Sequence, residues 1–139
     1  MYVLDTDVVS HLRRPEKADR KVAAWAASTP VVLHFISSIT LHELERGILL
    51  MERKDPVQGA VLRAWMDGQI LPRFAERILP VDIAVAQRCA RLHVPDPKSE
   101  RDAFIAATAL VHGMTVVTRN VDDFKPTGVE ILNPWEWEP

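Results

Sequence analysis

Met1-Tyr2-Val3-Leu4-Asp5-Thr6-Asp7-Val8-Val9-Ser10 is the stretch that decides the fold of this chain. Residues 2–4 are apolar with strong β propensity and predict a short buried strand. An acid follows at once, and the residues after it are typical of a helix start. In an open α/β sheet, a polar group at this strand–helix junction is well placed to bind a ligand. The simpler interpretation is that Asp5 or Asp7 only caps the helix.

The same alternation of strand and helix continues along the chain. Four more strands are predicted from apolar runs, at residues 31–37, 78–81, 115–118 and 129–132. Helical periodicity lies between them and is clearest over residues 38–54. Strands that alternate with helices favour a parallel sheet covered on both faces. We therefore expect an α/β fold, a three-layer α/β/α sandwich with a central, mostly parallel five-stranded sheet, in one domain over residues 1–139.

Composition excludes several classes of protein. The 139 residues carry 17 basic and 19 acidic side chains, a net charge of −2, so no global positive charge favours nucleic acid. The single Cys89 excludes an internal disulfide and a Cys-rich zinc site. We find neither a signal peptide nor a stretch that could span a bilayer. These features predict a cytoplasmic protein that does not contact membranes.

Acidic residues recur near the ends of the predicted strands. Asp5, Glu43 and the pair Asp122-Asp123 follow strands or begin helices, and Asp102 begins a helix after a loop. The carboxyl ends of parallel strands share one edge, so these acids can converge there. Converging carboxylates repel one another unless cations hold them, and oxygen-only ligands favour Mg²⁺ or Mn²⁺. Two such ions about 4 Å apart can promote phosphodiester hydrolysis.

Each acid also has a purely structural interpretation. Residues 40–43 match a capping box, in which Glu43 only supports a helix start. Asp102 follows a capping serine by three residues, where it complements the helix dipole. Gly47 lies one turn after Glu43, costs helix stability and clears space beside that acid.

Four segments together resemble a known family. They are VLDTDVVS at residues 3–10, ISSITLHELERGI at 36–48, RDAFIAATAL at 101–110 and VVTRNVDDFKPTGVEILNPW at 116–135. In order and spacing they are similar to the acidic motifs of the PIN-domain ribonucleases, specifically the VapC toxins of toxin–antitoxin pairs and the FitB-type proteins. The resemblance implies a metal-dependent endoribonuclease that cleaves RNA and is neutralised by a cognate antitoxin.

The resemblance also implies roles for individual residues. Asp5, Glu43, Asp102 and Asp123 match the catalytic, metal-binding acids, with Mg²⁺ or Mn²⁺ as the ion. A supporting set around them is expected to comprise Thr6, Asp7, Thr118, Asn120 and Asp122. The family usually has Asn where this chain has Asp7, and it is open whether Asn120, Asp122 or Asp123 supplies the fourth ligand.

Partners follow from the same comparison and from the charge pattern. Because net charge does not attract RNA, we expect local phosphate contacts from Arg46, Arg101 and Arg119. A homodimer and a higher toxin–antitoxin assembly on operator DNA are implied by the resemblance. We expect a partner to cover apolar side chains of the first helices, namely Val8, Val9, Leu12, Trp25, Leu49 and Leu50, although these can equally line the core.

Two other functions compete with the nuclease. Asp5-Thr6-Asp7 also resembles the DxD signature of haloacid-dehalogenase-type phosphatases, in which Asp5 is a nucleophile and Asp7 a general acid. No lysine follows the helix start in the manner that this chemistry needs, and Lys98 is a weak candidate. The other alternative is a largely binding or regulatory PIN module, which acts in a DNA-bound complex with its antitoxin.

Overall fold

The sheet is parallel throughout and has the strand order β3-β2-β1-β4-β5. A computed structural model describes all residues 1–139. Its strands are β1 (Tyr2–Leu4), β2 (His34–Ser37), β3 (Ile78–Leu79), β4 (Thr115–Val117) and β5 (Ile131–Leu132). The predicted five-stranded parallel sheet is therefore confirmed, with β1 at its centre.

The order of the strands places a topological switch beside β1. The chain runs outward from β1 through β2 to β3 and then returns to pair β4 with the other side of β1. Tyr2 lies opposite His34 on one side and Thr115 on the other. Such a switch creates a crevice beyond the carboxyl ends of the two strands, where ligands bind in open α/β sheets. Asp5 follows β1 and Thr118 follows β4, so both lie at this crevice.

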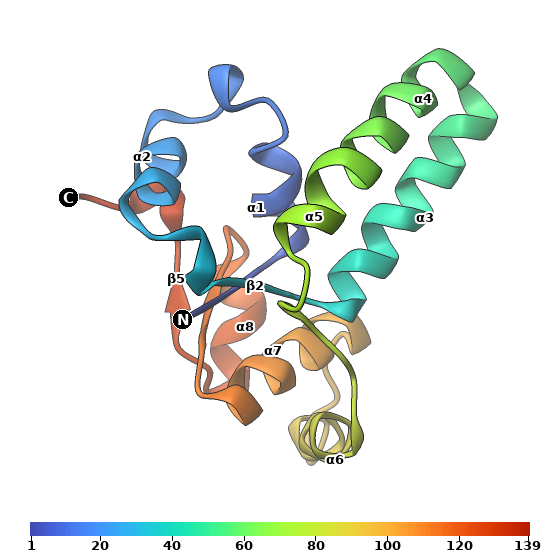
Figure 1. The fold of residues 1–139 in the computed structure, drawn as a ribbon. Helices are drawn as coiled ribbons and strands as arrows, with labels where there is room; N and C mark the ends of the chain where they lie inside the picture. Colours follow the sequence, from blue (N-terminus) through green and yellow to red (C-terminus); the bar gives the residue numbers. More distant parts are fainter.

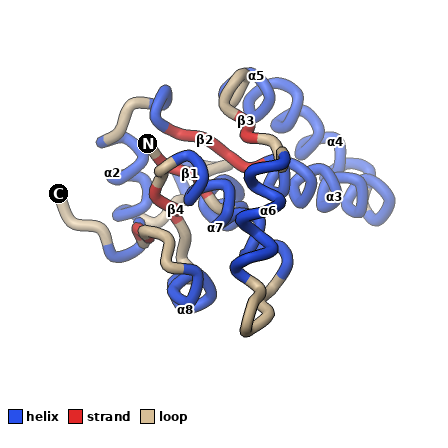
Figure 2. The backbone as a smooth tube through the Cα atoms, turned by 90° about the horizontal axis from the view of Figure 1, so that it is seen from below, coloured by secondary structure: helices blue, strands red, loops and turns tan.

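Helices cover both faces of the sheet (Figure 1). They are α1 (Thr6–His11), α2 (Arg20–Ser28), α3 (Ser38–Lys54), α4 (Pro56–Trp65), α5 (Leu71–Arg73), α6 (Ile83–Leu92), α7 (Glu100–His112) and α8 (Val121–Phe124). A π-helical turn at Met66–Ile70 joins α4 to α5. Figure 2 looks at the molecule from the side on which α6, α7 and α8 lie. The result is the expected three-layer sandwich.

The core follows the alternation of side chains along the strands. Leu4 and Val117 face a cluster formed with α1 to α4, and their neighbours Val3 and Val116 face a second cluster formed with α7 and α8. Alanines of α7 let this helix pack closely against β1 and β4, since Ala106 is fully buried. That close packing sets the start of α7 beside the crevice.

Several details differ from the expectation. Residues Val31–Leu33 form a 3-10 turn, so β2 begins only at His34. The N-cap of α3 is Ser37, whose side chain accepts from the Ile39 amide, so the predicted capping box at residues 40–43 is wrong. Pro80 ends β3 early because it cannot donate to the sheet.

The expected partner surface on the first helices is largely core. Val8, Val9 and Trp25 are only 0%, 4% and 1% exposed, so their assignment to a partner was wrong. Leu49 and Leu50 are exposed, together with Val57 and Val61 of α4. The exposed remainder therefore lies on the helical hairpin α3–α4, which extends away from the sheet in Figure 1.

The α3–α4 hairpin is held by close packing and by an ion-pair network. Arg63 of α4 donates to Glu45 over 2.8 and 2.5 Å and to Glu52 over 3.1 Å. Gly59 allows the helix axes to approach, since a Cβ there would lie 2.4 Å from Glu52 Cα.

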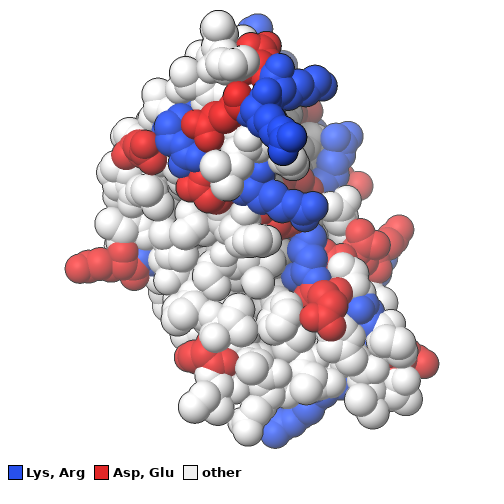
Figure 3. Space-filling view, turned by 90° about the vertical axis from the view of Figure 1, so that its right-hand side faces the viewer, with Lys and Arg blue, Asp and Glu red and all other residues white.

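On the face shown in Figure 3, basic and acidic side chains interleave in the upper part and uncharged side chains cover most of the rest. None of the helices combines the length and apolar character that crossing a bilayer requires.

Candidate active site

Asp5 anchors the site at the carboxyl end of β1. Its amide donates to the Val117 carbonyl over 2.9 Å, which continues the sheet by one residue beyond the strand. Its side chain is fully buried. One carboxylate oxygen accepts from the Thr6 amide over 2.8 Å, and the other accepts from the Thr118 hydroxyl over 2.8 Å. Asp5 therefore does cap α1, but it also presents a fixed carboxylate at the crevice.

Two further acids reach Asp5 from helix starts. Glu43 lies in the second turn of α3, and its Oε1 accepts from the Thr6 hydroxyl over 2.6 Å. Asp102 lies in the first turn of α7, whose N-cap Ser99 accepts from the Asp102 amide over 3.5 Å. The predicted capping serine is confirmed. Acids from three separate segments thus meet at the topological switch.

Arg101 occupies the centre of these three acids. Its Nη2 donates to Asp5 Oδ1 over 2.5 Å, its Nε to Glu43 Oε2 over 2.6 Å, and its Nη1 to Asp102 Oδ1 over 2.5 Å. Desolvation lowers the pKa of Arg101, but Asp5 and Glu43 outweigh it and raise the pKa above its ordinary value. The group remains a full positive charge between three carboxylates.

The fourth acid lies at the edge of the cluster. The pKa of Asp102 is raised by desolvation, opposed by Arg101, and raised further by the charges of Asp5 and Asp123. Asp123 is therefore within electrostatic reach of Asp102. The side chain of Asp122 is 98% exposed and lies 3.8 Å from Lys125. Of the two neighbouring aspartates, Asp123 is the one whose charge acts on Asp102.

The carboxylates of Asp5, Glu43 and Asp102, which bind Arg101, are also suitable ligands for a divalent ion. Three carboxylates that share one guanidinium carry more negative than positive charge, and all offer oxygen ligands, which Mg²⁺ and Mn²⁺ prefer. With the guanidinium between them, no three acids converge closely enough to ligate one ion. The chemistry of the residues fits a divalent ion once Arg101 is elsewhere.

Asp7 plays a different part from Asp5. Its Oδ2 accepts from the Arg119 amide over 3.1 Å, while its buried Oδ1 has no hydrogen-bond partner. Desolvation, and then the charge of Asp5, raise the pKa of Asp7 to about 6. Asp7 therefore ties the loop after β4 to α1 and is not among the acids that Arg101 binds.

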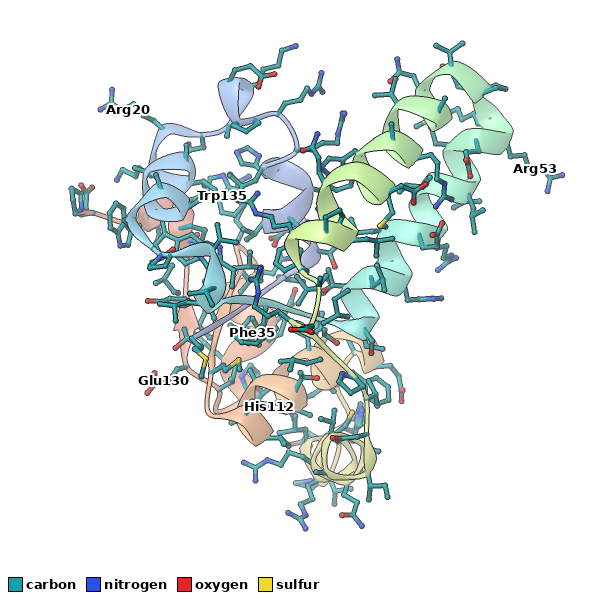
Figure 4. The ribbon with its side chains drawn as sticks, in the orientation of Figure 1. Arg20, Phe35, Arg53, His112, Glu130 and Trp135 are labelled. Carbon is teal, nitrogen blue, oxygen red and sulfur yellow. The ribbon has the colours of Figure 1, made fainter.

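The loop after β4 borders an open, polar hollow. The Asn120 amide donates to the Thr118 hydroxyl over 3.0 Å, so the loop is tied to the hydroxyl that holds Asp5. The Arg119 guanidinium lies 5.0 Å from the centre of the Trp135 ring. Arg119, Asn120, Asp123 and Lys125 are among the residues that line the hollow of about 520 Å³. In Figure 4, Trp135 lies beside α2.

A second hollow opens on the other side of Glu43. It has a volume of about 250 Å³, and Thr6, Arg13, Glu43 and Gly47 contribute to its walls. Nothing lies within 4 Å of the position that a Gly47 Cβ would take. The expected free space beside Glu43 is therefore present. Arg46, on the next turn of α3, is exposed to solvent.

Sequence reasoning missed two features of the site. It assigned Arg101 to RNA, whereas the structure turns its side chain onto the acids. It also overlooked Thr40, a buried hydroxyl 3.2 Å from the Thr6 hydroxyl that binds Glu43. A signal for the first was present, because a basic residue directly before the acid of a helix start can fold back onto it.

The comparisons with known proteins identify the family and agree with the fold. The PIN domain family model matches residues 2–129. The VapC ribonuclease Y4jK of Sinorhizobium fredii is 36% identical over 98% of this chain and 99% of its own. The toxin FitB of Neisseria gonorrhoeae is 38% identical over 97% of this chain and 99% of its own. The structure of FitAB bound to the IR36 DNA fragment superposes with a TM-score of 0.89 at 36% identity, over 100% of this chain and 99% of that one. The chain belongs to the PIN-domain family, within its VapC and FitB group.

Proposed function

We propose that this protein is the endoribonuclease toxin of a toxin–antitoxin pair and that it cleaves RNA with the help of Mg²⁺ or Mn²⁺. The observation that carries the proposal is the meeting of Asp5, Glu43 and Asp102 around one positive charge at the topological switch. Relatives that match nearly the whole chain and are named ribonuclease and toxin support the same activity.

In this proposal the acids hold the ion and neighbouring hydroxyls orient the acids. Asp5, Glu43 and Asp102 supply ligands, and Asp123 completes the set from the edge of the cluster. When bound, such an ion activates a water molecule and stabilises the leaving oxygen of a phosphodiester. Thr118 and Thr6 each hold one carboxylate in place through a hydrogen bond. Preorganised ligands avoid reorganisation during the reaction.

RNA then approaches over the polar loop after β4. Arg119 and Lys125 border the hollow next to Asp123, and Arg46 is exposed on α3, three residues after Glu43. A chain with a net charge of −2 cannot rely on general attraction, so individual guanidinium groups have to position the phosphates.

The expected protein partner is the cognate antitoxin. The similarity to FitAB bound to DNA supports an antitoxin complex that binds operator DNA, and we extend the proposal to a toxin homodimer within that assembly. The exposed leucines and valines of the α3–α4 hairpin offer apolar surface for protein contacts.

The phosphatase alternative loses its support in the structure. Lys98, the weak candidate for its lysine, donates to the carbonyls of Leu92 and Asp96 instead of reaching the acids. Asp7, its candidate general acid, accepts from a backbone amide. A regulatory module without activity fits poorly with a complete set of acids, and cleavage assays distinguish it from the nuclease.

The deciding experiment compares RNA cleavage by matched acid-to-amide variants. The wild type should cleave single-stranded RNA with Mg²⁺ or Mn²⁺ and stop on addition of EDTA. Asp5→Asn and Asp102→Asn should lose cleavage by at least about 10²-fold, because each removes a ligand. Asp67→Asn, on the π-helical turn away from the site, is the control and should cleave normally. Full cleavage by both site variants would refute the proposal.

A further inference from the structure

Arg101 makes three ionic contacts, with a different nitrogen for each acid. The three contacts span 2.5 to 2.6 Å and join residues from β1, α3 and α7. The Asp5 side chain is fully buried, whereas the Arg101 side chain is 29% exposed. One flat cation therefore joins a fully buried acid to two partly exposed ones and remains partly exposed to solvent itself.

The oxygens that Arg101 binds are the ones a metal ion needs. They are Asp5 Oδ1, Glu43 Oε2 and Asp102 Oδ1. A Mg²⁺ ion lies about 2.0–2.1 Å from its oxygen ligands, so its ligands crowd around a single point. A guanidinium is a broad plane that holds its acceptors apart, and the acids do not converge here on one point. Binding of the ion and this position of Arg101 exclude each other.

We propose that Arg101 is an internal counter-cation, which holds the metal-free acids in a self-paired state and which a divalent ion has to displace. The inference rests on the proposed metal centre. It assigns Arg101 a positioning role, because in the self-paired state the residue acts through the acids. The chain then regulates its own metal affinity without any partner.

Because the Arg101 side chain is partly exposed, it can rotate into solvent when an ion displaces it. Arg101 lies in the first turn of α7, whose backbone need not move when the side chain rotates toward solvent. The freed guanidinium stays tethered beside the acids, and its planar fork matches a phosphate group. Arg101 thus becomes available to an RNA phosphate only when the ion is in place. This order couples metal binding to substrate binding.

Competition of this kind weakens metal binding by a predictable factor. If the self-paired state is populated to between 90% and 99%, the apparent dissociation constant for the ion rises about 10- to 100-fold. Arg101→Gln should remove the competitor and tighten Mn²⁺ binding by that factor. Arg101→Lys keeps the positive charge but cannot bind the three acids at once. Its affinity for Mn²⁺ should therefore rise by a large part of the increase expected for Arg101→Gln.

Calorimetric titration of the isolated full chain with Mn²⁺ tests this prediction. Arg13→Gln is the matched control, because it removes a nearby charge that lines the hollow beside Glu43 and makes no ion pair with the acids, and it should bind Mn²⁺ like the wild type. Equal affinity of the wild type and Arg101→Gln would overturn the inference. A gain in Arg101→Gln with none in Arg101→Lys would also overturn it, because long-range charge alone would then explain the result.

A second measurement needs no variant that could fail to fold. The Arg101 Nε–H resonance of the wild type should shift on titration with Mg²⁺ at the same concentrations at which the ion binds. Ion binding without any change in this resonance would overturn the inference and leave the metal centre intact. Failure of the wild type and of both Arg101 variants to bind any ion would overturn the metal centre itself, and this inference with it.

Discussion

Thr118 donates its hydroxyl hydrogen to Asp5 Oδ2 over 2.8 Å, and both side chains are fully buried. The two residues are 113 positions apart in the sequence and are brought together by the parallel pairing of β1 with β4. The bond satisfies a buried carboxylate oxygen that otherwise has no donor. It therefore links the stability of the fold to the orientation of the acid.

Thr118→Val should destabilise the protein by about 1–3 kcal/mol, because a valine of nearly the same shape leaves that oxygen without a partner. Urea denaturation measures the loss. Thr118→Ser keeps the hydroxyl and should lose less. If Thr118→Val were as stable as the wild type, the bond would make no net contribution.

Asp7→Asn should stabilise the metal-free protein above neutral pH. Asp7 has a pKa of about 6 in the folded protein, above its ordinary 3.8. The folded state therefore holds the proton more tightly than the unfolded chain, and this stabilising contribution is full below pH 3.8 and is lost as the pH rises to 6. At pH 8 the ionised group costs about 1–2 kcal/mol, reduced from the full shift because the side chain is partly solvated.

Denaturation of the wild type and Asp7→Asn at pH 4 and pH 8, both with EDTA, measures this difference. Asp7→Asn should be more stable to denaturation than the wild type at pH 8 and about as stable at pH 4. Asp122→Asn, an exposed acid, serves as control and should show no such change. An equal effect of Asp7→Asn at both pH values would contradict the assigned cause.

Gly59→Ala should destabilise the α3–α4 hairpin by about 1–3 kcal/mol or more, because its methyl group would overlap the Glu52 backbone. Gly47→Ala is the matched control in the same hairpin, where the added methyl meets open space. It should gain about 1 kcal/mol from helix propensity alone. Thermal melts of both variants give the comparison, and the same sign for both would be inconsistent with the packing.

Arg119→Ala should weaken RNA binding and reduce the slope of log affinity against log salt by about one. The reason is the loss of one phosphate contact beside Asp123. Arg53→Ala is the control, because Arg53 lies at the far end of the α3–α4 hairpin in Figure 4. Fluorescence anisotropy with labelled RNA at several salt concentrations measures both. An unchanged slope for Arg119→Ala would indicate that its guanidinium stays on Trp135.

The structure also changes what we expect of the acids themselves. Repulsion among converging carboxylates would by itself let Asp5→Asn or Asp102→Asn leave the fold intact or even stabilise the metal-free protein. Because Arg101 already neutralises part of that charge, either substitution removes an ionic partner as well. Desolvation and the charges of Asp5 and Asp123 still raise the pKa of Asp102 although Arg101 opposes them, so ionised Asp102 costs stability near neutral pH. We therefore expect Asp102→Asn to stabilise the metal-free protein by less than repulsion alone would give. Circular dichroism melts with EDTA measure it, and a clear fall in melting temperature would indicate that the lost ion pair with Arg101 dominates.

The sequence by itself determined the fold class and the position of the acids along the chain. Short apolar runs that end in polar residues define parallel strands and the edge at which they stop, because both depend on neighbours in the chain. The N-cap residues Asp5 and Ser99 could be predicted for the same reason, since a cap bonds amides one to three residues away. The pattern of acids was also sufficient to suggest the family.

Only the tertiary structure decided which side chains share a site. The pairing of Thr118 with Asp5 depends on the register of β1 and β4, and the contact of Arg101 with Glu43 depends on how α3 and α7 pack. Such contacts join residues far apart in the sequence, so no local pattern encodes them. The same holds for Val8 and Trp25, whose burial depends on what covers them. Arg101 could be assigned to the acids only after three distant segments were brought to one crevice.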